Sequence, residues 1–375
     1  MKIVIDDKIP FIKGVLEPYA EVVYLSGAKI ALNDVADADA LIVRTRTHCN
    51  ESLLKNSSVK FIATATIGYD HIDTKWCEAN GIAWTNAPGC NSGSVYQYMA
   101  STLTTLSTHF GFRFEELTLG VVGVGNVGSK VAKLGKALGM EVLMNDPPRA
   151  KKEGPAQFVP FDEILSMSDI ITLHVPLNCS GAYHTYHLFD EDTFKCLPRR
   201  TILINSSRGE VVENITLKNF LKSGRIGAAV LDVWENEPDI NLDLLPLLNI
   251  ATPHIAGYSA DGKANGTAMS VQALSRFFGL PLNDWQPSEL PPPLQPLHFE
   301  LDCRGKTLQQ CLCDAIWHTY AVNDDDGLLR ASPSTFEKQR GDYPLRREFS
   351  AFTVEVKNPI PEIEIRLQEL GFSVG

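Results

Sequence analysis

The sequence lacks a hydrophobic run long enough to cross a membrane, and its first residues include acids where a signal peptide would need an apolar stretch. It also lacks an excess of positive charge, because 45 acidic residues face 34 basic ones and the net charge is -11. That balance argues against a general nucleic-acid or anionic-membrane surface. We therefore expect a cytoplasmic protein with no nucleic-acid or membrane partner, in which locally placed cations bind any anionic ligand.

Metal-binding and disulfide patterns are also missing. The eight cysteines are scattered, with no CxxC pair and no ligand spacing matched by nearby histidines. We expect no metal site and mostly reduced thiols, as in an unsecreted enzyme. Cys311 and Cys313 fit positions in an amphipathic helix.

The chain has 375 residues with 44% hydrophobic and 21% charged residues, typical of a globular protein with two or three domains. In the first 90 residues, short apolar runs alternate with polar helical or loop segments, a pattern that predicts a doubly wound parallel α/β domain. The predicted strands are 2–5, 21–25, 40–43, 61–64 and 82–84. We expect residues 1–92 to form one domain.

A long helix predicted over 92–110 leads into a second α/β pattern, which we assign to a nucleotide-binding domain over residues 93–257. Its predicted strands are 117–124, 141–144, 170–173, 201–204, 228–231 and 250–251. A further helix over 261–278 is expected to return to the first domain, so that about 258–282 complete it.

A proline-rich linker follows, since residues 286–297 contain five prolines, which stiffen a chain and exclude helix. Beyond it, helices predicted over 309–320 and 363–370 and a strand over 351–356 indicate a small α+β domain at 298–375. No chemical motif is evident there, so dimerisation or capping of an interface is the expected role.

The strongest motif is a strand followed by glycines at 123, 125 and 128 and then a helix. Gly123 permits the turn, Gly125 lets the backbone approach a pyrophosphate, and Gly128 lets helix and strand pack closely. Asp146 ends the next strand about 20 residues further on, where it can accept hydrogen bonds from ribose hydroxyls. The pattern predicts NAD rather than NADP, although Arg149 nearby weakens that preference. The alternative is a Rossmann-like turn that binds no nucleotide.

Three later segments, 204–212, 229–238 and 251–257, follow this motif in a fixed order. Together they resemble the D-isomer-specific 2-hydroxyacid dehydrogenase family over about residues 1–280. The resemblance implies two doubly wound Rossmann- or flavodoxin-like domains with an active site in the cleft between them. It also implies that residues 1–92, completed by about 258–282, form a substrate-binding domain. One departure concerns helix packing: many members carry an Ala-Glu pair after the position of Asn91, whereas this chain continues through Ser94 with Val-Tyr-Gln-Tyr.

The family chemistry explains three residue types. By resemblance, Arg208 grips the substrate carboxylate, because a guanidinium binds a carboxylate through two hydrogen bonds. His254 takes the hydroxyl proton, and Glu237 holds the far imidazole nitrogen. Glu235 is a nearby rival for the acid role. Taken singly, these residues could instead be a surface ion-pair partner, a loop histidine and a turn residue.

Further cofactor contacts follow by position at the carboxyl edge of the sheet, where ligands of open α/β sheets bind. Asp232 could reach the nicotinamide carboxamide or could equally cap its strand. The remaining cofactor residues predicted are Asn126, Val127, Val175, Pro176, Ser206, Ser207 and Gly257.

Arg44 and Arg46, which follow a buried strand, narrow the choice of substrate. Side chains two residues apart on an extended chain lie on one face, so the two arginines could converge on a phosphate dianion. The alternative is a pair of solvated surface arginines. By resemblance Thr45, Thr66, Gly68 and Tyr258 also contact the substrate.

The paired arginines and the C-terminal extension together resemble a branch of the family that oxidises a phosphorylated four-carbon 2-hydroxy acid in pyridoxine phosphate biosynthesis. The resemblance implies a homodimer in the bacterial cytoplasm. Arg346 and Arg347 in this extension could reach a phosphate across a dimer interface, but we expect a solvated basic pair. The rival hypotheses are a dehydrogenase of phosphoglycerate, glycerate or glyoxylate type, and an NAD-sensing corepressor.

Overall fold

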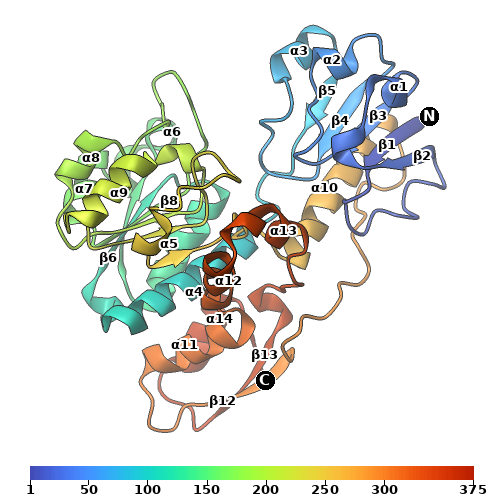
Figure 1. Ribbon diagram of the computed structural model, residues 1–375. Coiled ribbons are helices and arrows are strands. Elements are labelled where there is room, and N and C mark those ends of the chain that lie inside the picture. The colour runs from blue at the N-terminus through green and yellow to red at the C-terminus, as the bar shows by residue number, and fades with distance from the viewer. The chain divides into compact units, whose positions relative to one another are not determined.

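The computed structural model describes all 375 residues, which divide into two compact units. Unit 1 comprises Met1–Asn91 and Ser259–Pro291, and unit 2 comprises Ser92–Tyr258 and Pro292–Gly375. Figure 1 shows the ribbon of both units. No helix in either is long and apolar enough to cross a membrane.

Unit 1 is a five-stranded parallel sheet in the order β2-β1-β3-β4-β5, flanked by helices on both faces. Alternate strand residues face two separate apolar clusters, one including α1, α2 and α3 and the other including α10, as a doubly wound sheet requires. The strands are β1 (Lys2–Asp6), β2 (Glu21–Leu25), β3 (Ala40–Val43), β4 (Phe61–Thr64) and β5 (Ala83–Thr85). The helices are α1 (Leu32–Val35), α2 (Glu51–Leu54), α3 (Thr74–Ala79) and α10 (Ala260–Phe278). The predicted parallel fold is confirmed.

Strand order reverses between β1 and β3, and Arg44 directly follows β3. Its guanidinium donates to the carbonyl of Lys8 at 3.3 Å. Thr47 N–H donates to the Arg44 carbonyl, so residues 44–47 form a turn. The argument that Arg44 and Arg46 share a face of an extended chain is therefore wrong, although both lie at the sheet edge where ligands of such folds bind.

Unit 2 is built on a six-stranded parallel sheet in the order β11-β10-β9-β8-β6-β7. Its strands are continuous apolar runs because both faces are covered, by α4 and α5 on one side and by α7, α8 and α9 on the other. The strands are β6 (Thr118–Val122), β7 (Glu141–Asn145), β8 (Ile170–Leu173), β9 (Ile202–Asn205), β10 (Ala228–Leu231) and β11 (Ile250–Ala251). The helices are α4 (Ser92–Phe110), α5 (Asn126–Leu138), α6 (Pro147–Glu153), α7 (Phe161–Met167), α8 (Glu191–Cys196) and α9 (Asn214–Lys222).

Residues 292–375, which we call the C-terminal module, contain a three-stranded parallel sheet, β12-β13-β14, with four helices. The strands are β12 (His298–Asp302), β13 (Thr353–Lys357) and β14 (Ser373–Val374), and the helices are α11 (Leu308–Thr319), α12 (Val322–Ala331), α13 (Phe336–Gly341) and α14 (Ile363–Leu370). The sequence predicted α11, β13 and α14 but not the rest. No helix or strand occurs in the proline-rich residues 286–297.

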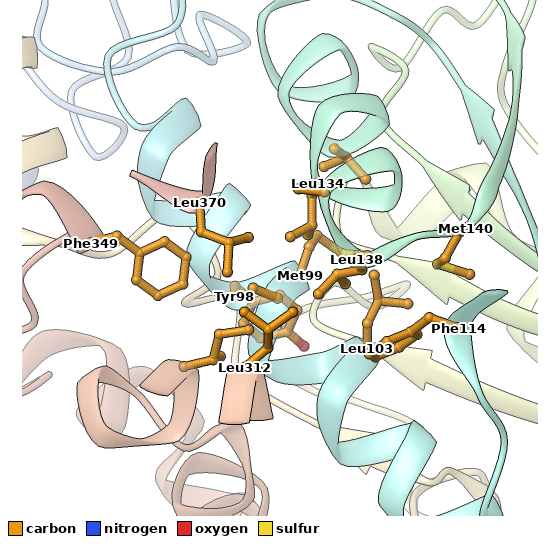
Figure 2. Packing of buried hydrophobic residues seen from close by; sticks show 14 of the residues in the cluster. Tyr98, Met99, Leu103, Phe114, Leu134, Leu138, Met140, Leu312, Phe349 and Leu370 are labelled. Carbon is orange, nitrogen blue, oxygen red and sulfur yellow. The ribbon is translucent and has the colours of Figure 1, made fainter. Parts of the chain in front are cut away.

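The C-terminal module shares one hydrophobic core with the nucleotide-binding part of unit 2. Figure 2 shows Leu312, Phe349 and Leu370 of the module packed together with Tyr98 of α4 and Leu134 of α5. All five side chains are nearly inaccessible to solvent. Burial of this kind, at about 25 cal/mol per Å² of apolar surface, ties the module to the sheet that carries the candidate site.

Candidate active site

The glycine-rich turn between β6 and α5 has the geometry of a dinucleotide cradle. Gly123 has a φ of +84°, and a Cβ there would lie 2.6 Å from the carbonyl oxygen of His174, after β8. A Cβ on Gly128 would collide with the Gly123 carbonyl. These two glycines therefore hold strand and helix close together at the point where strand order reverses between β6 and β8.

The remaining glycine faces open space. A Cβ on Gly125 would meet no atom within 4 Å, and no side chain caps the N-terminus of α5 at this residue. Unpaired N–H groups at a helix N-terminus bind phosphate oxygens, so the chain fits the pyrophosphate of NAD here. Asn126 and Val127 are the first residues of α5.

Asp146 lies beside this turn and is held by two backbone N–H groups. Its Oδ2 accepts from Val124 N at 2.8 Å and its Oδ1 accepts from Arg149 N at 3.0 Å. The guanidinium of Arg149 pairs with both carboxylate oxygens of Glu153, at 2.8 and 2.7 Å. Because Glu153 neutralises it, Arg149 is a poor partner for a 2′-phosphate, which favours NAD.

Arg208 stands three residues beyond β9, in a turn fixed by Asn205. The Asn205 amide donates to the Arg208 carbonyl at 2.8 Å and accepts from Ser207 N and Oγ. Arg208 itself is half-buried and donates to the Ser207 carbonyl at 2.8 Å. The Ser206 hydroxyl beside it is buried and has no hydrogen-bond partner in the protein, so it can form a hydrogen bond with a ligand.

Gly209 brings this turn against the segment that carries Glu237. A Cβ on Gly209 would collide with the backbone carbonyl of Trp234, which lies three residues before Glu237. Only glycine allows that approach. Gly209 was not among the residues predicted from the sequence, although a glycine directly after the arginine of a turn was an available signal.

Glu237 and His254 form a close pair after β10 and β11. Glu237 Oε2 lies 2.7 Å from His254 Nδ1, and Glu237 Oε1 accepts from Trp234 N at 2.8 Å. The side chains are 18% and 32% exposed respectively. Burial raises the pKa of the Glu237 carboxyl, but its contacts with His254, the Trp234 N–H and the charge of Arg340 outweigh burial and hold the pKa below its usual 4.5.

The backbone of His254 has a φ of +56°, in the left-handed region, and Asp232 stabilises that conformation. The Asp232 carbonyl accepts from His254 N at 2.7 Å. Its carboxylate accepts from Ile255 N at 2.8 Å and from Ala256 N at 3.0 Å. Asp232 is thus an anchor for the histidine loop, whereas its contact with the cofactor stays a prediction.

Glu235, the rival acid, pairs with a different histidine. Its Oε1 lies 2.7 Å from Nε2 of His187, and its Oε2 accepts from Asn214 N at 2.8 Å. The two acids therefore have separate partners, and the partner of His254 is Glu237.

Comparisons with known proteins place this geometry in a family. The D-isomer specific 2-hydroxyacid dehydrogenase NAD binding domain matches residues 94–256, and a domain of unknown function, DUF3410, matches 292–371. The erythronate-4-phosphate dehydrogenase of Bacteroides thetaiotaomicron is 50% identical over 94% of this chain and 99% of its own length. That of Proteus mirabilis is 42% identical over 96% of each. The chain belongs to the erythronate-4-phosphate dehydrogenase family.

A solved structure agrees with this assignment. The D-lactate dehydrogenase of Aquifex aeolicus, complexed with NAD and lactic acid, matches with a TM-score of 0.64 at 28% identity, over 74% of this chain and 96% of that one. As a member of the erythronate-4-phosphate dehydrogenase family, the protein is an NAD-dependent oxidoreductase. The family, the fold class and the cofactor predicted from the sequence are confirmed.

The site residues predicted for this family member fall in both units. The catalytic and cofactor residues lie in unit 2, with Val175 and Pro176 just after β8 and Gly257 just after the histidine loop. Tyr258, also in unit 2, packs edge-on against Tyr343. In unit 1, exposed Thr45 and Arg46 follow β3.

In the loop after β4, the hydroxyl of Thr66 donates to the carbonyl of Gly68 at 2.8 Å. These two residues thus form a compact turn at the carboxyl edge of the unit 1 sheet. Their contact with substrate stays a prediction.

One correction concerns the C-terminal module. Arg346 is only 5% exposed, so the prediction of a solvated Arg346–Arg347 pair is wrong. Its side chain extends into the interior of unit 2, where it contacts backbone carbonyls of the histidine loop.

Gly209→Ala tests whether the approach of the two turns matters. The added methyl group would force the Arg208 turn away from Trp234, and we expect a loss of about 1–3 kcal/mol of stability together with most of the activity. Chemical denaturation and steady-state rates measure both. Gly327→Ala, inside α12, where a Cβ meets nothing within 4 Å, is the control: it should keep the activity and, because alanine is the better helix former, raise stability by up to about 1 kcal/mol. Full activity in Gly209→Ala would contradict the role given to this glycine.

Proposed function

We propose that the protein oxidises 4-phospho-D-erythronate to 2-oxo-3-hydroxy-4-phosphobutanoate with NAD, a step in pyridoxine 5′-phosphate biosynthesis. One observation carries the catalytic part of this proposal. Strands β9, β10 and β11 are adjacent in the sheet, and Arg208, Glu237 and His254 follow their respective carboxyl ends. In an open α/β sheet, ligands bind at that edge.

In this proposal Arg208 binds the carboxylate of the hydroxy acid. A guanidinium offers parallel N–H donors that match a carboxylate, so it fixes the orientation of the substrate as well as its charge. The Asn205 amide holds the Arg208 turn in place. Orienting the acid group determines which face of C2 is turned toward the cofactor.

His254 acts as the proton acceptor in the oxidation and as the donor in the reverse reaction. Its Nδ1 faces Glu237, so Nε2 is the atom that takes the hydroxyl proton. The Glu237 carboxylate keeps the tautomer and stabilises the imidazolium that forms. NAD, held by the glycine-rich turn and α5, supplies the hydride acceptor.

Arg44 and Arg46 are proposed to bind the phosphate group, with Thr45, Thr66, Gly68 and Tyr258 as further substrate contacts. Support comes from the position of the two arginines at the strand-order reversal of the unit 1 sheet. We accordingly take residues 1–92 with about 258–282 as the substrate-binding domain, and residues 93–257 as the NAD-binding domain.

We further propose that the protein is a cytoplasmic homodimer assembled through residues 298–375, the part of the C-terminal module beyond the 286–297 linker. In support, two large apolar side chains of the module, Leu328 and Ile365, are 56% and 60% exposed. A second copy of the chain packed on them would remove this apolar surface from water.

A substrate panel tests the proposed function. Purified protein with NAD should oxidise 4-phosphoerythronate in preference to unphosphorylated erythronate, glycerate or 3-phosphoglycerate. Arg44→Ala and Arg46→Ala should each raise KM for the phosphorylated acid by about 10- to 150-fold, the worth of a charge-assisted hydrogen bond, while barely affecting unphosphorylated acids. Arg276→Ala, on α10 of the same unit, is the control. Turnover of only unphosphorylated acids would overturn the substrate assignment and leave the family intact.

Glu237→Gln tests the acid partner of His254. Because the amide carries no charge to stabilise the imidazolium, kcat should fall by about 100- to 10,000-fold. Glu235→Gln is the matched control, since Glu235 pairs with His187, and it should retain kcat within a few-fold. The reverse ranking of the two variants would assign the acid role to Glu235.

The loss of stability in Glu237→Gln should depend on pH. The pKa of Glu237 in the folded protein lies below its usual 4.5, so the stability that its ionised form contributes is complete above that pH and is lost as pH falls through the lower value. Glu237→Gln should therefore be less stable than the wild type near neutral pH, and the difference should shrink on acidification. Urea titrations at several pH values measure it, and a difference that grows on acidification would contradict the direction of this shift.

A further inference from the structure

Arg346 is a buried cation that has no assigned role in the proposed reaction. It lies between α13 and β13 of the C-terminal module and is 5% exposed. One guanidinium nitrogen, Nη2, lies 2.7 Å from the carbonyl of Ala256 and 3.4 Å from the carbonyl of Ile255. These two residues directly follow His254, so Arg346 contacts the loop that carries the proposed base.

The histidine loop is held from two sides by opposite charges. Asp232 accepts from the N–H groups of Ile255 and Ala256, and Arg346 donates to their carbonyls. Both side chains are almost fully buried. Because the peptide groups lie between a carboxylate and a guanidinium, their dipoles are aligned and the loop has little freedom to rotate.

Burying a guanidinium costs free energy unless hydrogen bonds and neighbouring groups compensate for lost water. Here the compensation comes from backbone carbonyls and aromatic groups. The guanidinium lies 4.3 Å from the ring centroid of Tyr320 and near the hydroxyl of Tyr343. Both tyrosines donate to the buried carboxylate of Asp325, at 2.7 and 2.8 Å. Its Nε remains without a partner, so the compensation for burial is incomplete.

The module also holds the chain just before the histidine. Asp326 of α12 accepts from Ala251 N at 2.7 Å, at the end of β11. Arg330, one turn further along α12, donates to the carbonyls of Leu245 and Leu248 at 2.8 and 2.9 Å. Asp326 is thus the module's contact close before His254, whereas the carbonyls that Arg330 contacts lie six or more residues before it.

We propose that Arg346 of the C-terminal module is the positioning residue for the His254 loop. The inference rests on the proposed role of His254 and gives a role to the region matched by a domain of unknown function. A histidine displaced by about 1 Å from the substrate hydroxyl loses on the order of 100-fold in rate. Arg346 keeps the loop where His254 meets the hydroxyl.

Arg346→Ala in the full-length protein tests this role, with Arg330→Ala as the matched control. Both arginines link the module to backbone carbonyls of the nucleotide-binding part, but Arg330 contacts carbonyls several residues before His254. Four quantities are measured for each variant: kcat and KM for 4-phosphoerythronate, the Kd of NADH from its fluorescence, and amide hydrogen exchange of the peptide covering 252–258.

We expect Arg346→Ala to lower kcat by about 100-fold while the Kd of NADH changes less than about threefold. Exchange at the amides of Ile255 and Ala256 should rise. Guanidinium ion at concentrations far below those that unfold the protein should restore part of the lost rate by occupying the vacated space. Arg330→Ala should keep kcat within about threefold, show no rescue, and raise exchange near Leu245 instead.

Wild-type kcat in Arg346→Ala, or equal losses of kcat in both variants without rescue, would overturn the inference. If Arg346→Ala does not bind NADH, Arg346→Lys decides, because lysine keeps the charge but its shorter side chain does not reach the position of Nη2; full activity in that variant contradicts the proposal. If the proposed function itself is wrong, the wild type will be inactive with 4-phosphoerythronate, which distinguishes that outcome from failure of this inference. The amide exchange of residues 252–258 in Arg346→Ala then tests the inference alone.

Discussion

The hydrogen bond between the Glu237 carboxylate and His254 Nδ1 is the interaction on which the proposed chemistry depends. It leaves Nε2 as the nitrogen available to a substrate hydroxyl. The Trp234 N–H holds the other carboxylate oxygen, and the lowered pKa keeps Glu237 ionised at neutral pH. A neutral partner in that position would neither fix the tautomer nor stabilise an imidazolium.

Backbone contacts determine where this pair lies. Gly209 lets the arginine turn approach Trp234, and Asp232 with Arg346 holds the loop after His254. The three turns come from neighbouring strands of one sheet, so small errors in any of them would separate groups that must meet one substrate. The C-terminal module belongs to this arrangement through both the shared core and the buried Arg346.

Much of this could be predicted from the sequence. Buried parallel strands are continuous apolar runs, so they were found to within a few residues, and the glycine-rich turn follows from its own steric requirements. Helix α12 was missed because its consecutive acids and Gly327 are poor helix formers, and contacts of Asp326 and Arg330 with distant backbone groups stabilise it. Arg346 gave no local signal, since its partners lie about 90 residues away in the chain.

A crystal structure of the protein with NAD and 4-phosphoerythronate tests the central claim most directly. The account predicts that the Arg208 guanidinium contacts the carboxylate of the bound acid while Nε2 of His254 lies within hydrogen-bond distance of its 2-hydroxyl group. An acid bound beside the nicotinamide with its carboxylate away from Arg208, or with its hydroxyl out of reach of His254, would contradict the account.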